Sequence, residues 1–249
     1  MTLNDKVAII TGASKGIGKA IAFAMGQAGA RLVISSRKQE AVDMVAAEFE
    51  AEGISVKAIA CNVGKADQRK ALIEQTIKAF NGIDILVNNA GANPAFGPTL
   101  SIEDWAYDKT MEVNLRGPYE LSRLVHPYMK AAASGSIINI SSVEGLTPNH
   151  GLGIYSISKA ALIMLTKVHA MEWGVDHIRV NAICPGFIKT KLSQAIFDNK
   201  QLLNGIMAKQ ALKQEGEVID IAGLACLLAS DASKFITGTA ITADGGLTI

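Results

Sequence analysis

Short apolar, β-branched runs alternate with amphipathic segments along the whole chain. The segments between the runs, such as "GKAIAFAMGQAG" and "DQRKALIEQTIKAFNG", repeat apolar residues three and four positions apart and end at Gly or Asn-Gly, as helices with C-cap signals do. The runs are apolar at consecutive positions, as strands buried on both faces are. We expect strands at "KVAIIT" (6–11), "RLVISS" (31–36), "SVKAIAC" (55–61), "IDILVNN" (83–89), "GSIINIS" (135–141), "HIRVNAIC" (177–184) and "TAITA" (239–243).

This alternation predicts a parallel sheet that right-handed crossovers cover with helices on both faces. Because no Pro-rich, Ser-rich or charged linker interrupts it, we predict a single α/β domain over residues 1–249, doubly wound in the Rossmann manner. The stretch 189–215 opens a long interval between the sixth and seventh strands. We predict a substrate lid there.

Composition narrows the classes of partner. The formal net charge is +1, without long charged runs, which does not favour nucleic acid or an anionic membrane surface. Neither a secretory signal pattern nor an 18-residue apolar stretch is present, so we expect a small-molecule substrate and no membrane partner. Cys61, Cys184 and Cys226 lie far apart without metal-ligand spacing, which predicts buried thiols in a reducing cytoplasm and no metal site, rather than a disulfide or a catalytic thiol.

A glycine-rich turn follows the first run directly. Gly12, Gly16 and Gly18 in "TGASKGIG" give a T-G-x-x-x-G-x-G spacing. It differs from the usual dinucleotide fingerprint, but the glycines equally allow a tight turn and a close approach of the backbone to a pyrophosphate at a helix N-terminus. A glycine turn without a ligand is the alternative; the strand before it and the helix after it favour dinucleotide binding.

The end of the second run indicates which dinucleotide binds. An Asp or Glu there would hold the ribose 2′-hydroxyl of NAD, whereas this chain has Ser36 followed by Arg37. Lys15, in the glycine turn, supplies a second cation. A small hydroxyl beside two cations suits a 2′-phosphate, so the sequence favours NADP(H) over NAD(H). Solvated surface charges are the alternative.

Six motifs, in this order, resemble those of the classical short-chain dehydrogenases/reductases. They are "TGASKGIG", "NNAG" (88–91), "VNL" with Asn114, "SS" with Ser142, "YSISK" (155–159) and "PGFIKT" (185–190). Within that family the sequence is similar to the NADP-dependent carbonyl reductase and retinol dehydrogenase branch, and less closely to bacterial 3-oxoacyl-(acyl carrier protein) reductases. The resemblance implies a seven-stranded doubly wound sheet and hydride transfer between a nicotinamide and an alcohol or ketone.

The resemblance also implies which residues contact the cofactor. Those lining the diphosphate would be Gly12, Ser14, Gly16, Ile17 and Gly18. Those nearer the adenosine would be Asn62, Val63, Asn88, Ala90, Gly91 and Val113. Those flanking the nicotinamide carboxamide would be Pro185, Gly186, Ile188 and Thr190. Many family members carry Asp at the position of Asn62, whose amide oxygen can still accept from the adenine amino group.

Reduction of a carbonyl by hydride leaves an alkoxide that needs a proton from an acid. In a helical "YSISKAALIMLTKV", Tyr155 and Lys159 lie one turn apart on one face, and the ammonium is expected to lower the pKa of the phenol from its usual value near 10. The resemblance implies that Tyr155 is the acid in reduction and the base in oxidation, and that Lys159 also holds the nicotinamide ribose. The alternative is that both are rim residues of an amphipathic helix.

Two more residues complete the implied catalytic set. Ser142 precedes Tyr155 by thirteen residues, the family's interval, so it would polarise the substrate oxygen while Ser141 turns elsewhere. Asn114 would support a water in a proton path toward Lys159.

The predicted surroundings of the site are less specific. Glu144 either points into the substrate pocket, where it would bind a hydroxyl or amine, or faces solvent. His150 is interpreted as a wall or surface residue rather than a base. Six apolar side chains are candidates either for the pocket wall or for the core: Phe96, Ile154, Phe187, Leu192, Ile196 and Met207.

The sequence favours an NADP(H)-dependent carbonyl reductase or alcohol dehydrogenase of small to medium apolar substrates. A 3-oxoacyl-(acyl carrier protein) reductase would need a basic patch at the site mouth, for which Lys130 and Arg179 are weak hints. A nucleotide-sensing scaffold would be expected to lack one of the four catalytic residues, and all four are present. Apolar residues on several faces of "AALIMLTKVHAMEW" and "AGLACLLASD" suit a homotetramer, with a dimer as the alternative.

Overall fold

Seven parallel strands form one sheet in the order β3-β2-β1-β4-β5-β6-β7. The structure is a computed structural model that describes residues 1–191 and 193–249, without the side chains of Ala195, Ile196 and Leu202. The strands are β1 Val7–Thr11, β2 Arg31–Ser36, β3 Val56–Ala60, β4 Ile85–Asn88, β5 Gly135–Ile140, β6 Ile178–Pro185 and β7 Ala240–Ala243. The predicted doubly wound, seven-stranded sheet is therefore confirmed.

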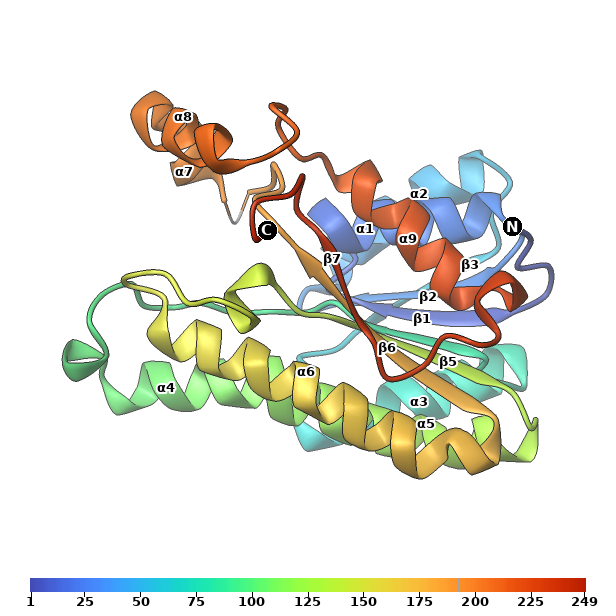
Figure 1. Ribbon diagram of the computed structural model, residues 1–249. Coiled ribbons are helices and arrows are strands. Elements are labelled where there is room, and N and C mark those ends of the chain that lie inside the picture. The colour runs from blue at the N-terminus through green and yellow to red at the C-terminus, as the bar shows by residue number, and fades with distance from the viewer. Residues whose placement is uncertain (192) are drawn as a thin grey trace.

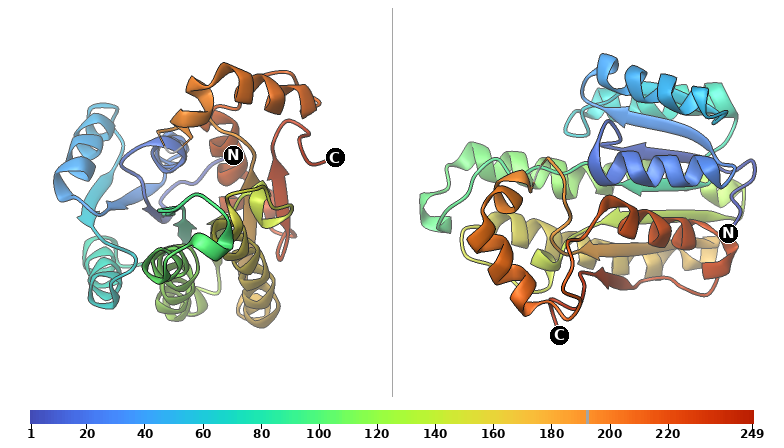
Figure 2. Two further views of the ribbon diagram at one scale, coloured as in Figure 1. Left: turned by 90° about the vertical axis from the view of Figure 1, so that its left-hand side faces the viewer. Right: turned by 90° about the horizontal axis from the view of Figure 1, so that it is seen from above.

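Helices cover both faces of this sheet (Figure 1). They are α1 Gly16–Gln27, α2 Gln39–Ala51, α3 Ala66–Phe80, α4 Asp104–Met111, α5 Gly117–Ala131, α6 Gly153–Trp173, α7 Gln194–Asp198, α8 Lys200–Lys209 and α9 Val218–Ala229. One layer contains α1, α2 and α9; in the other, α3, α5 and α6 lie side by side (Figure 2). Helices α7 and α8 lie beyond the carboxyl ends of the strands.

Two apolar cores explain why the strand sequences are apolar at consecutive positions. In β1, Ala8 and Ile10 pack into the core under α1, α2 and α9, whereas Ile9 between them packs into the core under α3 and α5. All three side chains are fully buried. Because neighbouring residues of a strand point to opposite faces, a strand covered on both sides requires apolar residues at every position.

The chain folds in opposite directions from the middle of the sheet. Strand β1 has β2 on one side and β4 on the other, so the connections that follow β1 and β4 leave to opposite faces. Such a reversal opens a crevice at the carboxyl ends of the strands, where doubly wound folds bind their ligands. Thr11 lies at the end of β1 and joins it to the segment after β4. The Oγ1 atom of Thr11 accepts from the N–H groups of Asn89 and Ala90, each at 3.1 Å.

A π-helical turn, η2 (Glu112–Arg116), joins α4 to α5. The extra residue in such a turn rotates the side chains that follow and occurs often at functional sites. It carries Val113 and Asn114, both buried, so two of the predicted site residues lie on this turn.

Two observations bear on predictions made from composition. Cys61, Cys184 and Cys226 are buried and free, as predicted. Within residues 1–191 and 193–249, no helix combines the length and the apolar character that crossing a bilayer requires. A cytoplasmic location stays a prediction.

Candidate active site

The glycine turn after β1 is closely packed. Gly12 and Gly16 have left-handed φ angles of 67° and 59°, which side chains other than glycine adopt at a cost. A Cβ on Gly12 would lie 2.8 Å from Nδ2 of Asn89, and a Cβ on Gly18 would overlap the same atom and lie 2.6 Å from the carbonyl oxygen of Gly12. Space and backbone geometry therefore both require glycine here.

The first turn of α1 is open to an anion. It has no side-chain cap at Lys15 and no acidic residue, so its N–H groups and the positive end of its dipole face the crevice unneutralised. Ser14 and Ile17 are half-buried beside it. A glycine cradle at an uncapped helix N-terminus is the arrangement that binds phosphate groups.

Asn89 holds this turn in place, and sequence reasoning missed it. Its Nδ2 donates to the carbonyl oxygens of Thr11 and Gly12, at 2.8 and 3.2 Å. Asn88 was the predicted member of "NNAG", but its side chain is 2% exposed and donates to Asn139 and Ser122 on the opposite side of the sheet. The side chain of Asn88 thus points to the opposite face from that of Asn89, because successive strand residues alternate, and its contact with the cofactor stays a prediction; the same alternation would have selected Asn89.

The ends of β1 and β2 lie side by side, because Ala13 N–H donates to Ser35 O at 3.0 Å. Ser36 follows, half-buried, with Oγ donating to Lys38 O at 3.4 Å. Arg37 and Lys15 are exposed, and neither cationic group pairs with any residue that the structure describes. The two predicted cations are thus available to a ligand at this end of the crevice.

The loop after β3 is braced against η2. Asn62 Oδ1 accepts from Gly64 N–H at 3.1 Å, so its amide is already used in a local turn. Val63 is buried, and its carbonyl oxygen accepts from the guanidinium of Arg69, which also pairs with Glu112 of η2 at 3.2 Å. Of the two residues predicted to lie near the adenosine, Asn62 is therefore partly exposed, whereas Val63 is buried.

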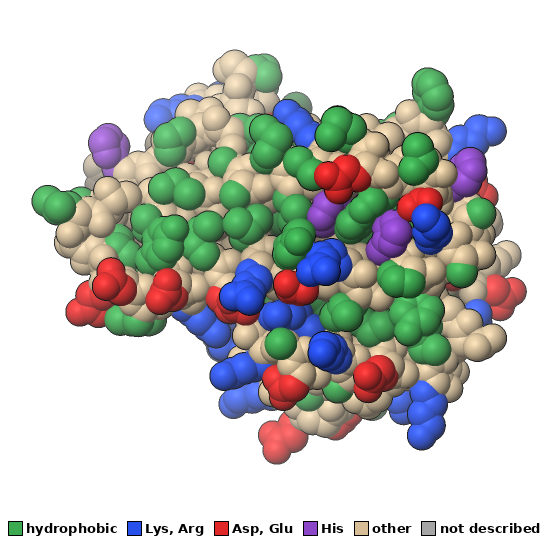
Figure 3. Space-filling model, turned by 90° about the horizontal axis from the view of Figure 1, so that it is seen from below, with side chains coloured by type: hydrophobic (Ala, Val, Ile, Leu, Met, Phe, Trp, Pro, Cys, Tyr) green, Lys and Arg blue, Asp and Glu red, His purple; other side chains and the backbone are tan. Residues whose placement is uncertain are grey.

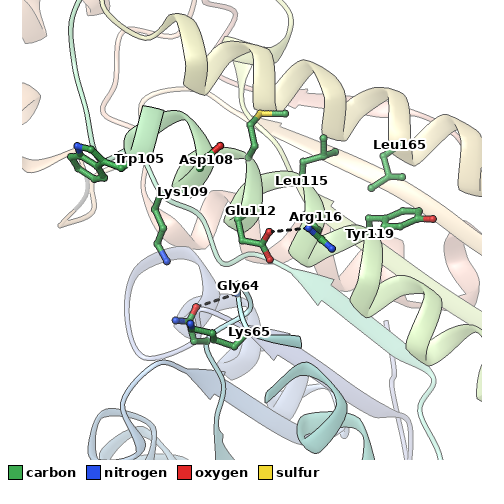
Figure 4. A pocket seen from close by; sticks show the side chains of 12 residues that line it. Gly64, Lys65, Trp105, Asp108, Lys109, Glu112, Leu115, Arg116, Tyr119 and Leu165 are labelled. Carbon is green, nitrogen blue, oxygen red and sulfur yellow. Dashed lines mark hydrogen bonds and ion pairs between the residues drawn. The ribbon is translucent and has the colours of Figure 1, made fainter. Parts of the chain in front are cut away.

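A groove of about 960 Å³ runs from this loop along α4, η2 and α5 (Figure 4). Asn62, Gly64 and Lys65 lie on one side, and α4 and α5 contribute the other, with Trp105 at one end and Tyr119 toward the other. None of Asn114, Ser142, Tyr155 and Lys159 lines it. The groove is therefore a separate surface feature.

Tyr155 and Lys159 lie in the first two turns of α6, as predicted. The Lys159 Nζ atom is 5.6 Å from the centre of the Tyr155 ring and donates to the Ile140 carbonyl oxygen at 2.7 Å. A Cβ on Gly91 would be 3.8 Å from this Nζ and 3.7 Å from Oδ1 of Asn114. The segment after β4, the π-turn and α6 therefore meet at one point.

Asn114 is fully buried, with its amide bonded to protein. Oδ1 accepts from Ala92 N–H at 2.7 Å, and Nδ2 donates to Ala92 O at 2.9 Å and to Ser158 Oγ at 3.0 Å. These contacts fasten the segment after β4 to α6. The predicted support of a water stays a prediction.

Ser142 caps the short helix η3 (Val143–Gly145) and faces Tyr155. Its Oγ accepts from Glu144 N–H at 3.1 Å, and its side chain forms a hydrogen bond with Tyr155. Ser141 turns the other way and donates to Lys159 O at 2.9 Å. The choice of Ser142 over Ser141 thus agrees with the geometry.

Burial governs the protonation of this pair. It raises the pKa of Tyr155 to about 12. The hydrogen bond with Ser142 opposes this increase, and the negative charge of Glu144 adds to it. It also lowers the pKa of Lys159 to about 8. The expectation that Lys159 lowers the pKa of the phenol is therefore wrong for the chain itself, because desolvation disfavours phenolate and ammonium alike.

The segment after β6 crosses to the glycine turn. Pro185 ends β6, and a Cβ on Gly186 would lie 2.7 Å from Cβ of Asp244. Ile188 is buried and pairs in a parallel bridge with Gly216. Thr190 Cγ2 lies 3.5 Å from the position of a Cβ on Gly16, so both ends of the predicted cofactor site are brought together.

Glu144 does not face solvent, which was one of the two alternatives considered for it, and its contact with a substrate stays a prediction. It is 5% exposed, and its carboxylate accepts from Asn149 N–H, Asn149 Nδ2 and Ser156 Oγ. It therefore neither faces solvent nor has a carboxylate without partners. His150 is exposed, in agreement with a surface role.

The apolar candidates are divided by exposure. Phe96 is 77% exposed and its ring packs over Gly151. Half-buried are Ile154, Phe187 and Met207. Leu192 lies outside the described residues, as does the side chain of Ile196.

Comparison with known proteins gives consistent matches. A family model described as enoyl-(acyl carrier protein) reductase matches residues 12–248. "Dehydrogenase/reductase SDR family member 4" of Oryctolagus cuniculus is 39% identical over 244 residues, which are 98% of this chain and 94% of that protein. "Dehydrogenase/reductase SDR family member 2, mitochondrial" of Homo sapiens is 39% identical over 243 residues, 98% of this chain and 86% of that protein.

Solved structures match equally completely. A gluconate 5-dehydrogenase from Burkholderia cenocepacia, in complex with NADP and tartrate, superposes with a TM-score of 0.96 at 33% identity, covering 99% of this chain and 96% of that one. A short-chain type dehydrogenase/reductase from Mycobacterium ulcerans gives a TM-score of 0.96 at 28% identity, covering 99% and 91%.

The Asn89→Ala variant tests the bracing of the glycine turn. It removes the donor to two buried carbonyl oxygens, which should cost about 1–3 kcal/mol and lower the melting temperature by about 3–8 °C. Asn204→Ala, an exposed change in α8, is the control and should stay within about 0.5 kcal/mol. Thermal unfolding followed by circular dichroism measures both, and equal melting temperatures would contradict the bracing role.

Proposed function

The chain belongs to the short-chain dehydrogenase/reductase family of oxidoreductases, and on that premise we propose that it transfers a hydride between NADP(H) and a ketone or secondary alcohol. The proposed substrates are small to medium and apolar, as for a carbonyl reductase or alcohol dehydrogenase. One observation carries the proposal: Tyr155, Lys159 and Asn114 converge on the segment after β4, with Ser142 bonded to Tyr155.

The residues of the crevice fit a nicotinamide dinucleotide. The glycine turn, in which Gly12 and Gly18 lie too close to protein atoms for a side chain, is at an uncapped helix N-terminus, which suits a diphosphate. When bound, the cofactor supplies or accepts the hydride. We propose contacts from Gly12, Ser14, Gly16, Ile17, Gly18, Asn62, Ala90, Gly91, Pro185, Gly186, Ile188 and Thr190. The buried Val63 and Val113 would act through their backbones or as the walls behind these residues.

The proposal that the site binds the 2′-phosphate of NADP(H) rests on Arg37 and Lys15. Both are exposed beside Ser36 and unpaired within the described chain, and a carboxylate that would repel the phosphate is absent at position 36. The solved gluconate 5-dehydrogenase that the chain resembles is a complex with NADP. NADP(H) is therefore proposed in preference to NAD(H).

Proton transfer is assigned to Tyr155. With its pKa raised to about 12, the phenol is protonated throughout the neutral range and is ready to donate to the alkoxide that reduction creates. Ser142, hydrogen-bonded to Tyr155, would donate to the same oxygen and polarise the carbonyl. The buried ammonium of Lys159 would stabilise the phenolate left behind, and Asn114 would fix the segment that separates it from solvent.

The alternative functions gain less support. Lys130 pairs with Asp176 at 3.0 Å, and the guanidinium of Arg179 donates to Leu228 O and Ser233 Oγ, each at 2.8 Å. These cations are thus engaged within the chain rather than free for an acidic carrier protein. Activity on 3-oxoacyl thioesters but not on simple ketones would favour the carrier-protein reductase. A nucleotide-sensing scaffold would not need the four converging side chains.

We also propose that 189–215 is a substrate lid on the single domain. Helices α7 and α8 lie beyond the carboxyl ends of the strands (Figure 1), and the two ends of the segment are joined by the Lys189–Glu215 ion pair at 3.0 Å. Gln210, buried at the end of this segment, donates to Asp244 O at 3.2 Å. The lid would thus move about fixed ends.

A homotetramer is the proposed assembly. Hydrophobic side chains gather on the face formed by α4, α5 and α6 (Figure 3), where Trp105, Ile157, Met164 and Met171 are each more than half exposed. Ile219 at the start of α9 and Phe235 before β7 are exposed as well. Apolar surfaces of this kind indicate contacts between subunits. A dimer would use only one of these two apolar surfaces.

Tyr155→Phe tests the acid. It keeps the ring and removes the proton donor, so turnover should fall by about 10²–10⁴-fold while NADPH binding is retained. NADPH absorbance with a panel of ketones, α-diketones, 3-oxo esters and alcohols measures turnover, and fluorescence titration measures binding. Tyr107→Phe, at an exposed tyrosine, is the control. Unchanged turnover in Tyr155→Phe would refute the assignment.

Arg37→Ala tests the choice of cofactor. Loss of a charge-assisted contact should raise the dissociation constant of NADPH by about 10–100-fold and leave that of NADH unchanged. Lys57→Ala, which removes an exposed cation on β3, should change neither value. If Arg37→Ala weakened the binding of NADPH and NADH equally, Arg37 would not be the group that binds the 2′-phosphate.

Met171→Glu tests the assembly. Met171 is 76% exposed on α6, so a charge there should leave the fold intact but disrupt a contact between subunits and reduce the mass in solution. Met44→Glu, the same change at an exposed position on α2, should leave the mass unchanged. Light scattering after size exclusion measures the mass, and a monomeric wild type would contradict the proposed tetramer.

A further inference from the structure

Glu144 is a buried carboxylate with three donors around it. It is 5% exposed, and it accepts from Asn149 N–H at 3.1 Å, Asn149 Nδ2 at 2.6 Å and Ser156 Oγ at 2.8 Å. The N–H groups can only donate, and the Ser156 hydroxyl is within hydrogen-bond distance of both this carboxylate and Leu152 O, at 2.8 and 3.0 Å. No cation of the described chain pairs with it.

Glu144 contacts both segments that carry the hydroxyls to which the proposed chemistry is assigned. The backbone N–H of Glu144 donates to Ser142 Oγ at 3.1 Å. Its side chain bonds Ser156, the residue after Tyr155 in α6. One residue therefore fixes the position of Ser142 relative to the first turn of the helix that carries Tyr155.

The same carboxylate also anchors a loop. Asn149 lies in the segment 146–152, which has few contacts of its own with the sheet but supports a second segment through the Gly97 N–H bond to Gly151 O at 3.0 Å. The Phe96 ring packs over Gly151, and Thr99 packs against Gly153. Without the anchor at Glu144, backbone bonds of Leu146 and Thr147 to Val143 O and of Ser156 to Leu152 O would still hold the two ends of the loop, but Asn149 between them would lose its bonds to Glu144.

We propose that Glu144 is a positioning residue: its N–H holds the Ser142 hydroxyl, and its carboxylate fixes loop 146–152 as a wall of the substrate site. This rests on the proposed function for the roles of Tyr155 and Ser142. It also deepens it, because three protein donors already hold the Glu144 carboxylate in place, so that it acts on the loop rather than as the group that binds the substrate.

The charge effect has a defined sign. The negative charge of Glu144 opposes formation of a phenolate and so contributes to the raised pKa of Tyr155. The other groups that face this pair are Lys159 under the ring, Cys184 of β6 near Lys159, and the neutral Asn114 of η2. His150 in the loop is exposed. Removing the charge of Glu144 must lower the pKa of Tyr155 and move activity that needs phenolate to lower pH.

Glu144→Gln separates charge from shape, and Ser156→Ala removes one hydrogen bond while keeping the charge. In Glu144→Gln, the acid limb of kcat/KM for alcohol oxidation should move down by about one pH unit or less, whereas Ser156→Ala should leave the limb in place. Both should speed amide hydrogen exchange in 146–152, by about fivefold or more. Glu172→Gln, the same change at an exposed position of α6, is the control for both readouts.

If the acid limb of the kcat/KM profile did not move in Glu144→Gln, the effect of the Glu144 charge on Tyr155 would be refuted. If amide hydrogen exchange in 146–152 were unchanged in both variants, the anchoring of this loop by Glu144 would be refuted. Hydrogen exchange requires no turnover, so an inactive wild type would refute the proposed function and still leave the anchor testable. Should Glu144→Gln fail to fold, Asn149→Ala keeps the carboxylate, removes the Nδ2 donor while the backbone N–H stays, and must speed exchange in the loop.

Discussion

The placement of the whole site depends on two consecutive residues of β5 that hold α6 against the sheet. Asn139 Nδ2 donates to Thr166 Oγ1 at 2.9 Å, and the carbonyl oxygen of Ile140 accepts from Lys159 Nζ at 2.7 Å. Thr166 lies seven residues, or about two turns, after Lys159 and therefore on the same face of α6. Leaving such a buried group without a partner costs about 1–3 kcal/mol, so a shift of the helix along the sheet is disfavoured. Asn88 completes the chain of contacts from β4 to Asn139.

This rigid attachment has an electrostatic consequence. A helix that buries Lys159 withdraws its ammonium from water and leaves Tyr155 half-buried, and the pKa values of both move toward the neutral forms. The negative charge of Glu144 raises the pKa of the phenol further. The chain itself thus presents Tyr155 as a protonated acid, which suits donation to an alkoxide. Accepting a proton in the reverse direction requires a further positive charge, which the oxidised nicotinamide ring would provide.

The sequence predicted the architecture well because its signals are local and periodic. Continuous apolar runs located all seven strands to within one or two residues, as at β3, expected over 55–61 and observed over Val56–Ala60. The motif residues Tyr155, Lys159 and Ser142 also lie together as expected. Predictions that depended on contacts distant in sequence were weaker. Asn89 was missed, the π-turn under Asn114 was not foreseen, and the direction of the Tyr155 pKa shift was reversed, because burial depends on the assembled fold.

Under the proposed function, chemistry and specificity would be carried by different parts of this molecule. The glycine turn, the segment after β4, β5 and α6 are tied by hydrogen bonds, and Thr190 lies against Gly16 from the far side. The proposed substrate side would be formed by segments 92–103, 146–152 and 189–215. One backbone bond and the Phe96 ring join the first two, and an ion pair joins the ends of the third, in which Gln210 and Leu212 also bond to the turn after β7. Changes in those segments would alter the shape of the pocket without disturbing the bonds that hold Tyr155 and Lys159. Glu144 is the exception, because it belongs to both parts, and a change there would alter pocket and acid together.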